Sequence, residues 1–427
     1  MNWDDRIQQA ALTDIGMRRA NNQDSHAVVL SNDMEAWKKR GHFFMVADGM
    51  GAHAAGELAS KLAVDGVQHL YHKYTDLSPP EALQKAILET NGEVHRRGQA
   101  NSDFHNMGTT ASTLVLLPQG ALIAHIGDSR VYRVRADRLQ QLTKDHSLVW
   151  ELREQLPDDG ELAIPKNVIT RSLGPNPSVQ ADIEGPLPIE VADTFLLCSD
   201  GLTGRVTDEE LAPILKHIPP GEAGHLLVDL ANLRGGPDNI TVIVVKVVGK
   251  DLASATNGSE PLRVGGSKSS ATVQPAIWVC LGVCLLGALV LWVTDKSLPA
   301  LMAGFGALVA LLVGLVSHQR GKKTGGVSLN EGRRLGGGPY TDTLCAPPGQ
   351  SVALLRDITT ELRTAPLNKN WTIDWSPFDK HCGTGRASEE AGQHVQAMRS
   401  YAQAIRHLMS EVRAAQDRDA SDSSIDY

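Results

Sequence analysis

The stretch that decides the fold is Phe43–Gly49, which reads Phe-Phe-Met-Val-Ala-Asp-Gly, an apolar run that ends on an acidic residue and a glycine. Two later stretches have the same character. Thr194–Gly201 reads Thr-Phe-Leu-Leu-Cys-Ser-Asp-Gly, and Asp238–Val245 reads Asp-Asn-Ile-Thr-Val-Ile-Val-Val. Apolar runs of this length, bounded by Gly, Asp or Asn, are typical of buried strands. The sequence therefore predicts three core strands, each with an acid at one end.

These acids have an ordinary and a chemical interpretation. An Asp-Gly pair after a strand is a favoured turn, so a single pair indicates a turn more often than a site. Asp48, Asp200 and Asp238 together are harder to explain as turns, because neighbouring strands lie only ~4.8 Å apart and would gather the acids at one edge. Like charges at that separation repel unless a cation lies between them. The three acids therefore predict a cation site.

The ligand types indicate which cation. Carboxylate and carbonyl oxygens without nearby Cys or His favour Mg²⁺ or Mn²⁺. Two such ions ~3.5–4 Å apart activate a water molecule and stabilise both oxygens of an in-line displacement. The pattern predicts the hydrolysis of a phosphate ester.

Working outward, residues 7–249 alternate apolar runs, turn residues and amphipathic helical stretches, which predicts one mixed α and β domain of its own. The strands expected, the three above included, are His42–Ala47, Ala111–Leu117, Ala121–Ile126, Val131–Arg135, Thr194–Cys198 and Ile240–Val248. The helices expected are Ala54–Tyr71, Pro80–Arg97, Asp208–His217 and Glu222–Leu233.

Composition excludes several classes of protein. The chain has 427 residues, with 41 Lys and Arg against 49 Asp and Glu, and its net charge of −8 argues against a nucleic-acid binder. A hydrophobic content of 42% fits a folded globular protein. Five scattered cysteines argue against a disulfide scaffold and fit a reducing compartment. The acidic start of the sequence is unlike a secretory signal peptide.

The middle of the chain predicts a membrane anchor. Residues 250–275 are polar and Gly/Ser-rich, as in a flexible linker, and two uncharged stretches follow at 276–294 and 297–317. Each is long enough to cross a bilayer as a helix, although a buried helical hairpin of a globular domain would look similar. Cations flank both outer ends, so we expect a two-span hairpin in the inner membrane with both ends cytoplasmic.

Beyond it, residues 318–349 are Gly-rich and predict a second linker. Residues 350–416 contain two amphipathic helical patterns, which suit a small bundle, an oligomerisation element or a docking surface. Residues 417–427 form an acidic, Ser-rich tail.

Eight segments, in order, resemble the metal-dependent Ser/Thr protein phosphatases of the protein phosphatase 2C (PPM) type, and look most like the bacterial branch that reverses Ser/Thr kinases. They are Arg19–Ser25, Val46–Glu57, Met107–Thr110, His125–Arg130, Leu142–Ser147, Ile169–Gly174, Leu197–Leu202 and Asp238–Val242. The resemblance implies an α+β fold, a four-layer αββα sandwich with two central antiparallel sheets and the metals at one end. The hairpin and a mostly helical C-terminal region would follow it.

The resemblance also implies roles for individual residues. Asp48, Asp200 and Asp238 would hold two Mn²⁺ or Mg²⁺ ions, Gly49 would add its carbonyl, and Asp24 would bind through water. Asp128 matches the ligand of a weaker third ion. Arg19 matches the arginine that binds the substrate phosphate, a task suited to its planar, charged group. The expected partners are phosphorylated proteins and the Ser/Thr kinases that act on them, membrane lipid, and no nucleic acid.

Two departures bear on the chemistry. Gln23 stands where the family commonly has Glu, and Met50 stands where eukaryotic members have a histidine proposed as the general acid. His53 is the nearest candidate for that acid, and it is equally well explained as a packing residue at the start of a helix. The polar segment Leu148–Asn167 corresponds to the family's variable flap near the substrate.

The rival functions are a non-catalytic phosphoprotein-binding module and an enzyme devoted to one regulator, such as an antagonist of an anti-sigma factor. The first is disfavoured because every metal carboxylate is retained, and the second because the Arg19 segment is retained. The sequence therefore predicts a membrane-anchored protein phosphatase that hydrolyses phosphoserine and phosphothreonine with water activated by two metal ions.

Overall fold

The computed structural model describes residues 3–51, 54–155, 168–254, 261–264, 275–294, 327–329, 334–364 and 372–423, with a few single residues between 299 and 311. The chain divides into two compact units. One is formed by Met1–Glu260 together with Asn330–Tyr427, and the other by Pro261–Leu329. All the predicted catalytic residues belong to the first unit.

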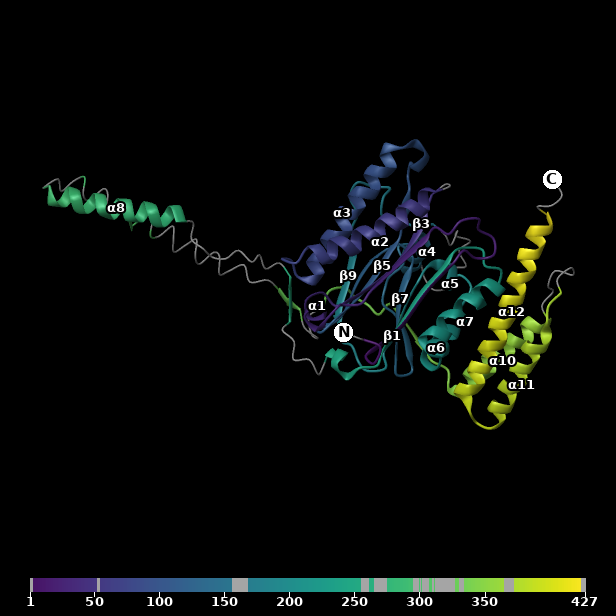
Figure 1. Ribbon diagram of the computed structural model, residues 1–427. Helices are drawn as coiled ribbons and strands as arrows, with labels where there is room; N and C mark the ends of the chain where they lie inside the picture. Colours follow the sequence, from purple (N-terminus) through teal and green to yellow (C-terminus); the bar gives the residue numbers. More distant parts are fainter. Residues whose placement is uncertain are drawn as a thin grey trace. The chain divides into compact units, whose positions relative to one another are not determined.

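Two antiparallel sheets form the centre of this unit (Figure 1). In spatial order, the first contains β1 (Ile7–Asp14), β11 (Ile240–Val247), β10 (Thr194–Cys198), β7 (Arg130–Arg135), β8 (Arg138–Gln141) and β14 (Thr341–Leu344). The second contains β2 (Asp24–Val29), β3 (His42–Met50), β5 (Ala111–Leu117), β6 (Gly120–Ile126) and β9 (Asp182–Leu187), and the short β4 (Gly108–Thr109) pairs with the end of β3.

Alternation along the strands explains why these runs are apolar throughout. In β10, Phe195 and Leu197 pack into the cluster between the two sheets, while Leu196 and Cys198 pack on the helical side. β11 repeats the arrangement, with Ile243 facing the other sheet. Because side chains alternate across a strand and both faces are covered, neither face is left polar.

Helices cover the outer face of each sheet (Figure 1). The helices α1 (Met34–Arg40), α2 (Ala55–Lys73) and α3 (Pro79–Ala100) contact the second sheet, and α5 (Asp200–Thr203), α6 (Asp208–His217) and α7 (Pro220–Leu233) contact the first. The single-turn 3-10 segments are Ser102–Phe104 and Lys250–Leu252. Capping boxes, Ser78 with Glu81 and Thr207 with Glu210, define where α3 and α6 begin. The predicted α+β sandwich is confirmed.

The C-terminal part of the chain adds a further layer of helices to this sandwich. The helices α10 (Pro348–Thr364), α11 (Trp375–Glu390) and α12 (His394–Ser423) contact one another, with α10 against α6 and α12 against α7. Before them, β14 pairs antiparallel with β8, from Thr341 opposite Gln141 to Leu344 opposite Arg138. Residues 341–344, within the segment predicted as a Gly-rich linker, therefore form a strand of the first sheet.

The second unit contains β12 (Leu262–Val264) paired with β13 (Val327–Leu329), and the helix α8 (Pro275–Val293). Within the part of the chain that the structure describes, no helix has both the length and the apolar character needed to cross a membrane. A crossing takes about 20 apolar residues in one helix. The prediction of a transmembrane hairpin over 276–317 is therefore wrong.

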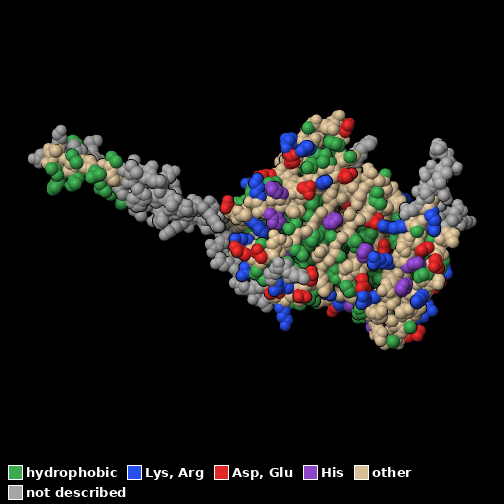
Figure 2. Space-filling view, in the orientation of Figure 1, with side chains coloured by type: hydrophobic (Ala, Val, Ile, Leu, Met, Phe, Trp, Pro, Cys, Tyr) green, Lys and Arg blue, Asp and Glu red, His purple; other side chains and the backbone are tan. Residues whose placement is uncertain are grey.

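The visible surface carries acidic and basic side chains intermixed, and Figure 2 shows no face given over to one sign in that view. This distribution agrees with the modest net charge of −8.

Candidate active site

The strands place the predicted acids at one end of the sandwich. Asp24 opens β2 and lies directly opposite Asp48 of β3 in the antiparallel register. Asp200 begins α5, which follows β10, and Asp238 lies two residues before β11. β10 and β11 are neighbours in the first sheet, and the backbone N–H of Ser199 donates to the carbonyl of Thr241 at 3.0 Å. Acids far apart in the sequence are thus brought together.

Burial first, and the charges of their acidic neighbours second, raise the pKa values of these acids. Loss of water and the charges of Asp24, Asp200, Asp128 and Asp238 raise the pKa of Asp48 well above its usual value. Burial raises the pKa of Asp24 to about 7, although hydrogen bonds from Thr241 and Ser199 oppose the shift. The pKa of Asp200 is raised by burial and by Asp238. This is the behaviour of carboxylates gathered without enough positive charge.

Asp128 belongs to the same group of acids. Burial and the charge of Asp200 raise its pKa to about 7. One buried oxygen each of Asp24 and Asp128, the Oδ1 atoms, has no hydrogen-bond partner among the described residues. Unpaired buried carboxylate oxygens are costly, so both atoms point to a missing partner.

A hard divalent cation fits this donor set, because the gathered groups offer only oxygen. As they stand, the described acidic, histidine and cysteine side chains include no group of three arranged to hold a metal ion. The evidence for a bound ion is therefore the oxygen chemistry of these side chains and their unpaired buried oxygens, more than their exact placement.

Gly49 has the close backbone packing expected of a residue beside the site. A Cβ at this position would lie 2.1 Å from the carbonyl oxygen of Gly56, so no larger residue fits. Its N–H donates to the carbonyl of Gln23 at 3.1 Å. The Gln23 side chain donates in turn to the carbonyl of Gly51 at 3.4 Å, and so ties this loop where the family commonly has a carboxylate.

Arg19 lies on the loop between β1 and β2. Its Nη2 donates to Oδ2 of Asp238 at 2.8 Å, and its side chain is 47% exposed. The Asn239 side chain holds the loop, because its Nδ2 donates to the carbonyls of Ile15 and Asn21 at 2.9 and 3.0 Å. Gly16 allows the sharp turn: its φ is +82°, and a Cβ there would lie 2.2 Å from the carbonyl oxygen of Asp238.

A chain of polar groups that begins at the buried His146 supports the loop that carries Asp128. The N–H of Gly127 donates to Nδ1 of His146 at 3.0 Å, so Nε2 of that ring carries the proton and lies 3.0 Å from Oδ2 of Asp182. Arg171 donates to the other oxygen of Asp182 at 2.7 Å. Burial opposes ionisation of Asp182, but His146 and Arg171 outweigh it and lower the pKa of Asp182 to about 2.

Sequence reasoning missed several of these supporting residues. His146 and Arg171 lie inside the quoted motif segments, but nothing indicated that Asp182 would join them. The sequence predicts Asn239 only as the start of a strand. Its position next to Asp238 was the one signal that it supports the site.

Two predicted elements fall partly or wholly outside the described residues. His53 is not described, so its side chain adds nothing to the geometry of the site. Of the predicted flap, Leu148–Gln155 forms the helix α4, and residues 156–167 are not described. Cys198 is fully buried within β10, as expected of a core residue, and burial raises its pKa to about 12.

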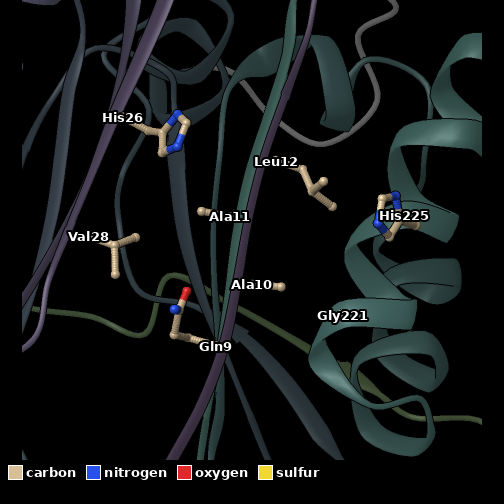
Figure 3. Close-up of a pocket in the computed structure, with 8 residues that line it drawn as sticks. All are labelled: Gln9, Ala10, Ala11, Leu12, His26, Val28, Gly221 and His225. Carbon is tan, nitrogen blue, oxygen red and sulfur yellow. The ribbon is translucent and has the colours of Figure 1, made fainter.

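A cavity of about 540 Å³ lies elsewhere, against β1 (Figure 3). His26 of β2 and His225 of α7 lie on opposite sides of that strand. None of the gathered acids lines the cavity, so the chemistry of the site does not belong to it.

Comparisons with known proteins show which family this chain resembles. The family model described as protein phosphatase 2C matches residues 17–223. The serine/threonine phosphatase stp of Listeria innocua is 37% identical over 242 residues, which are 55% of this chain and 93% of that protein. Protein phosphatase PhpP of Streptococcus pneumoniae is 38% identical over 250 residues, 56% of this chain and 97% of its own length.

Among solved structures, the crystal structure of the Mycobacterium tuberculosis serine/threonine phosphatase PstP matches with a TM-score of 0.50 and 32% identity. The match covers 57% of this chain and 100% of that one. The two relatives and the solved structure align with 55%, 56% and 57% of this chain.

Proposed function

The chain belongs to the protein phosphatase 2C family, and from that membership we propose that its acid group hydrolyses phosphoserine and phosphothreonine esters of proteins with the help of two divalent cations. The enzyme is a metal-dependent protein-serine/threonine phosphatase, and its cofactor is Mn²⁺ or Mg²⁺. The single observation that carries the two-cation mechanism is the gathering of Asp48, Asp200 and Asp238, with the pKa of Asp48 raised by loss of water and by its acidic neighbours.

We assign the ligands from the resemblance to the family. Asp48, Asp200, Asp238 and the carbonyl of Gly49 would hold the two ions, Asp24 would act through water, and Asp128 would serve a weaker third ion. Bound ions would lower the pKa of the attacking water and neutralise charge that develops on the phosphoryl oxygens. The unpaired Oδ1 atoms of Asp24 and Asp128 support this assignment.

Arg19 would bind the substrate phosphate. Its guanidinium is exposed enough to meet a ligand, and in the structure it contacts a carboxylate of the site. A planar, permanently charged fork suits the paired oxygens of a phosphate. The Asn239 contacts and the turn at Gly16 hold the loop, so Arg19 is aimed at the acids before substrate arrives.

The leaving serine or threonine oxygen needs a proton, for which His53 and water are the two sources. The substitution His53→Ala separates them. If His53 donates, the variant loses activity on a phosphothreonine peptide by ~10²-fold but keeps it on an aryl phosphate, whose leaving group needs no proton. If the variant keeps the wild-type activity on both substrates, the proton comes from water and His53 is a packing residue.

The decisive experiment measures the release of phosphate from phosphoserine and phosphothreonine peptides with and without Mn²⁺. The variants Asp48→Ala and Asp200→Ala are compared with Asp251→Asn, an acid that pairs with Arg6 outside the site. We expect activity in the wild type and the control alone. If Asp48→Ala retained activity, the two-cation assignment would be wrong.

The physiological counterparts would be Ser/Thr protein kinases, whose phosphorylated products this enzyme would reverse. A non-catalytic role is disfavoured because the described site keeps its full set of acids. Comparing the phosphoproteome of a deletion strain with that of the parent would identify the substrates.

A further inference from the structure

The C-terminal helices share an apolar core with the catalytic half. Leu226 and Leu230 of α7 belong to the same buried cluster as Val352 of α10 and Ile405 of α12. The helices α10–α12 therefore pack on α6 and α7 as a layer of the phosphatase itself (Figure 1).

Charges align α12 on α7. Arg399, Arg406 and Arg413 are spaced by seven residues, or two helical turns, and so share one side of α12. Arg399 donates through Nε to Glu222 of α7 at 2.7 Å. Seven residues after Glu222, Asp229 of α7 is near enough to Arg406 and Arg413 for both to oppose the rise in its pKa that burial causes.

The last arginine of this row reaches the loop that carries Arg19. Arg413 donates to Oδ2 of Asp14, the final residue of β1. The other oxygen of Asp14 accepts from the N–H of Gly16 at 2.9 Å and from the Asn232 side chain at 3.1 Å. Asp14 is thus the residue through which α12 meets the first turn of the loop, two residues before Gly16 and five before Arg19.

A second contact holds the same turn. The side chain of Met17 packs against the cluster formed by Phe378, Ala404, Leu408, Met409 and Val412 of α11 and α12. The N–H of Met17 donates to the carbonyl of Gly236 at 2.8 Å. Gly236 has no space for a side chain, because a Cβ would lie 2.7 Å from Met17. The turn is therefore fixed between α12 and the segment leading to Asp238.

Resting on the proposed role of Arg19 in binding phosphate, we infer that Arg413 and Met17 are positioning residues for Arg19, and that docking of α12 sets the affinity of the enzyme for its phosphorylated substrate. The Asn239 side chain fixes the two ends of the loop at Ile15 and Asn21, while the α12 contacts fix the turn between them. Arg19 itself is about half exposed, so its aim depends on this turn. No metal ligand is touched by Arg413 or Met17, so the effect falls on substrate binding.

The test uses the full chain with Mn²⁺ and a phosphothreonine peptide. Arg413→Ala should raise KM ~5-fold and change kcat less than about 2-fold, since coupling between sites starts at this size. The matched control is Arg399→Ala, fourteen residues before Arg413 on α12. It also removes an arginine–carboxylate pair, but the partner is Glu222 of α7 and not Asp14 of β1. We expect its KM to equal that of the wild type.

Hydrogen exchange gives a readout that does not depend on catalysis. In Arg413→Ala the peptide covering residues 14–23 should exchange faster, whereas in Arg399→Ala it should not. Arg413→Lys, which keeps the charge, should restore most of both properties. Melting temperatures of the two alanine variants show whether either has lost its fold. If Arg413→Ala has, Arg413→Lys is compared with Arg399→Ala in its place.

The inference is overturned if Arg413→Ala and Arg399→Ala have the same KM, or if exchange of residues 14–23 is unchanged in Arg413→Ala. A wild type without Mn²⁺-dependent phosphatase activity would instead refute the proposed function, and the exchange experiment would still decide whether α12 orders the loop.

Discussion

Acidic side chains gather in two regions of this molecule, and the two gatherings are built in opposite ways. At the end of the sandwich, Asp48 and its neighbours raise one another's pKa values. Where α12 packs on α7 and on the end of β1, Glu222 of α7 meets Arg399 and Asp14 of β1 meets Arg413. Where the purpose is packing, the chain supplies its own cations. At the catalytic end the chain supplies too few cations for its acids, so the carboxylates are free to bind metal ions from solution.

The comparison would fail most visibly if Asp48 were dispensable. Asp48→Asn should lower phosphatase activity by at least ~10³-fold, because bound cations contribute several kcal/mol to the transition state. The same change removes a charge from a repelling group, so it should raise the melting temperature of the metal-free protein. Mn²⁺ should raise the melting temperature of the wild type and raise that of the variant far less. Calorimetry with and without Mn²⁺ checks both points, with Asp251→Asn as the control.

Arg19 combines features of the two regions, because it is a cation of the chain itself that contacts an acid of the catalytic end. Arg19→Ala should lower kcat/KM ~100-fold, mainly through KM, because a charged pair of hydrogen bonds to phosphate is lost. Arg19→Lys should fall between the alanine variant and the wild type, since it keeps the charge and loses the fork. Steady-state kinetics on one phosphopeptide measures all three. An unchanged KM in Arg19→Ala would remove Arg19 from substrate binding.

The sequence predicted the acids well because each lies at the end of an apolar run, and strand ends in one sheet must lie near one another. It missed β1 and β2, whose polar residues at Gln8, Gln9, Ser25 and His26 interrupt the apolar pattern. It also left open what the C-terminal helices do. Their amphipathic pattern shows that one face is covered, but the covering surface depends on which distant side chains meet it, such as Glu222 with Arg399. Asp182 was missed for the same reason, since its partners His146 and Arg171 lie elsewhere in the chain.

Asp229 sharpens the comparison, because it is an acid of the packing region that behaves like one of the catalytic region. Burial raises its pKa to about 7, against the charges of Arg413 and Arg406 from α12 and with that of Asp14 from β1. Between about pH 4 and 7 the folded protein keeps a proton on Asp229 that the unfolded chain has lost. The stability contributed by this residue therefore falls as the pH rises to 7 and is constant above it.

The test is Asp229→Asn, which cannot ionise. Its free energy of unfolding should exceed that of the wild type by an amount that grows from pH 4 to 7, and the growth should be about 4 kcal/mol. Urea unfolding at several pH values measures the difference. A difference that does not depend on pH would show that Asp229 is charged in the folded protein.

The smallest effect is expected for the pair Glu222 and Arg399. Both side chains are more than one-third exposed, so solvent screens their attraction. A double-mutant cycle of Glu222→Ala and Arg399→Ala should give a coupling energy of about 0.5 kcal/mol, reduced further in high salt. A coupling of zero would mean that the apolar cluster alone holds α12 on α7.

The pairing of β14 with β8 has a practical consequence for anyone who shortens this protein. The relatives align with only 55–56% of this chain, which would suggest a shortened protein that lacks the C-terminal helices. Such a cut would remove β14, leave β8 with β7 as its one remaining neighbour in the sheet, and expose the leucines of α7 that face α12. An open strand beside bare apolar surface is a template for aggregation. Poor solubility of the isolated catalytic half would then reflect the missing C-terminal layer rather than a defect in the fold of that half.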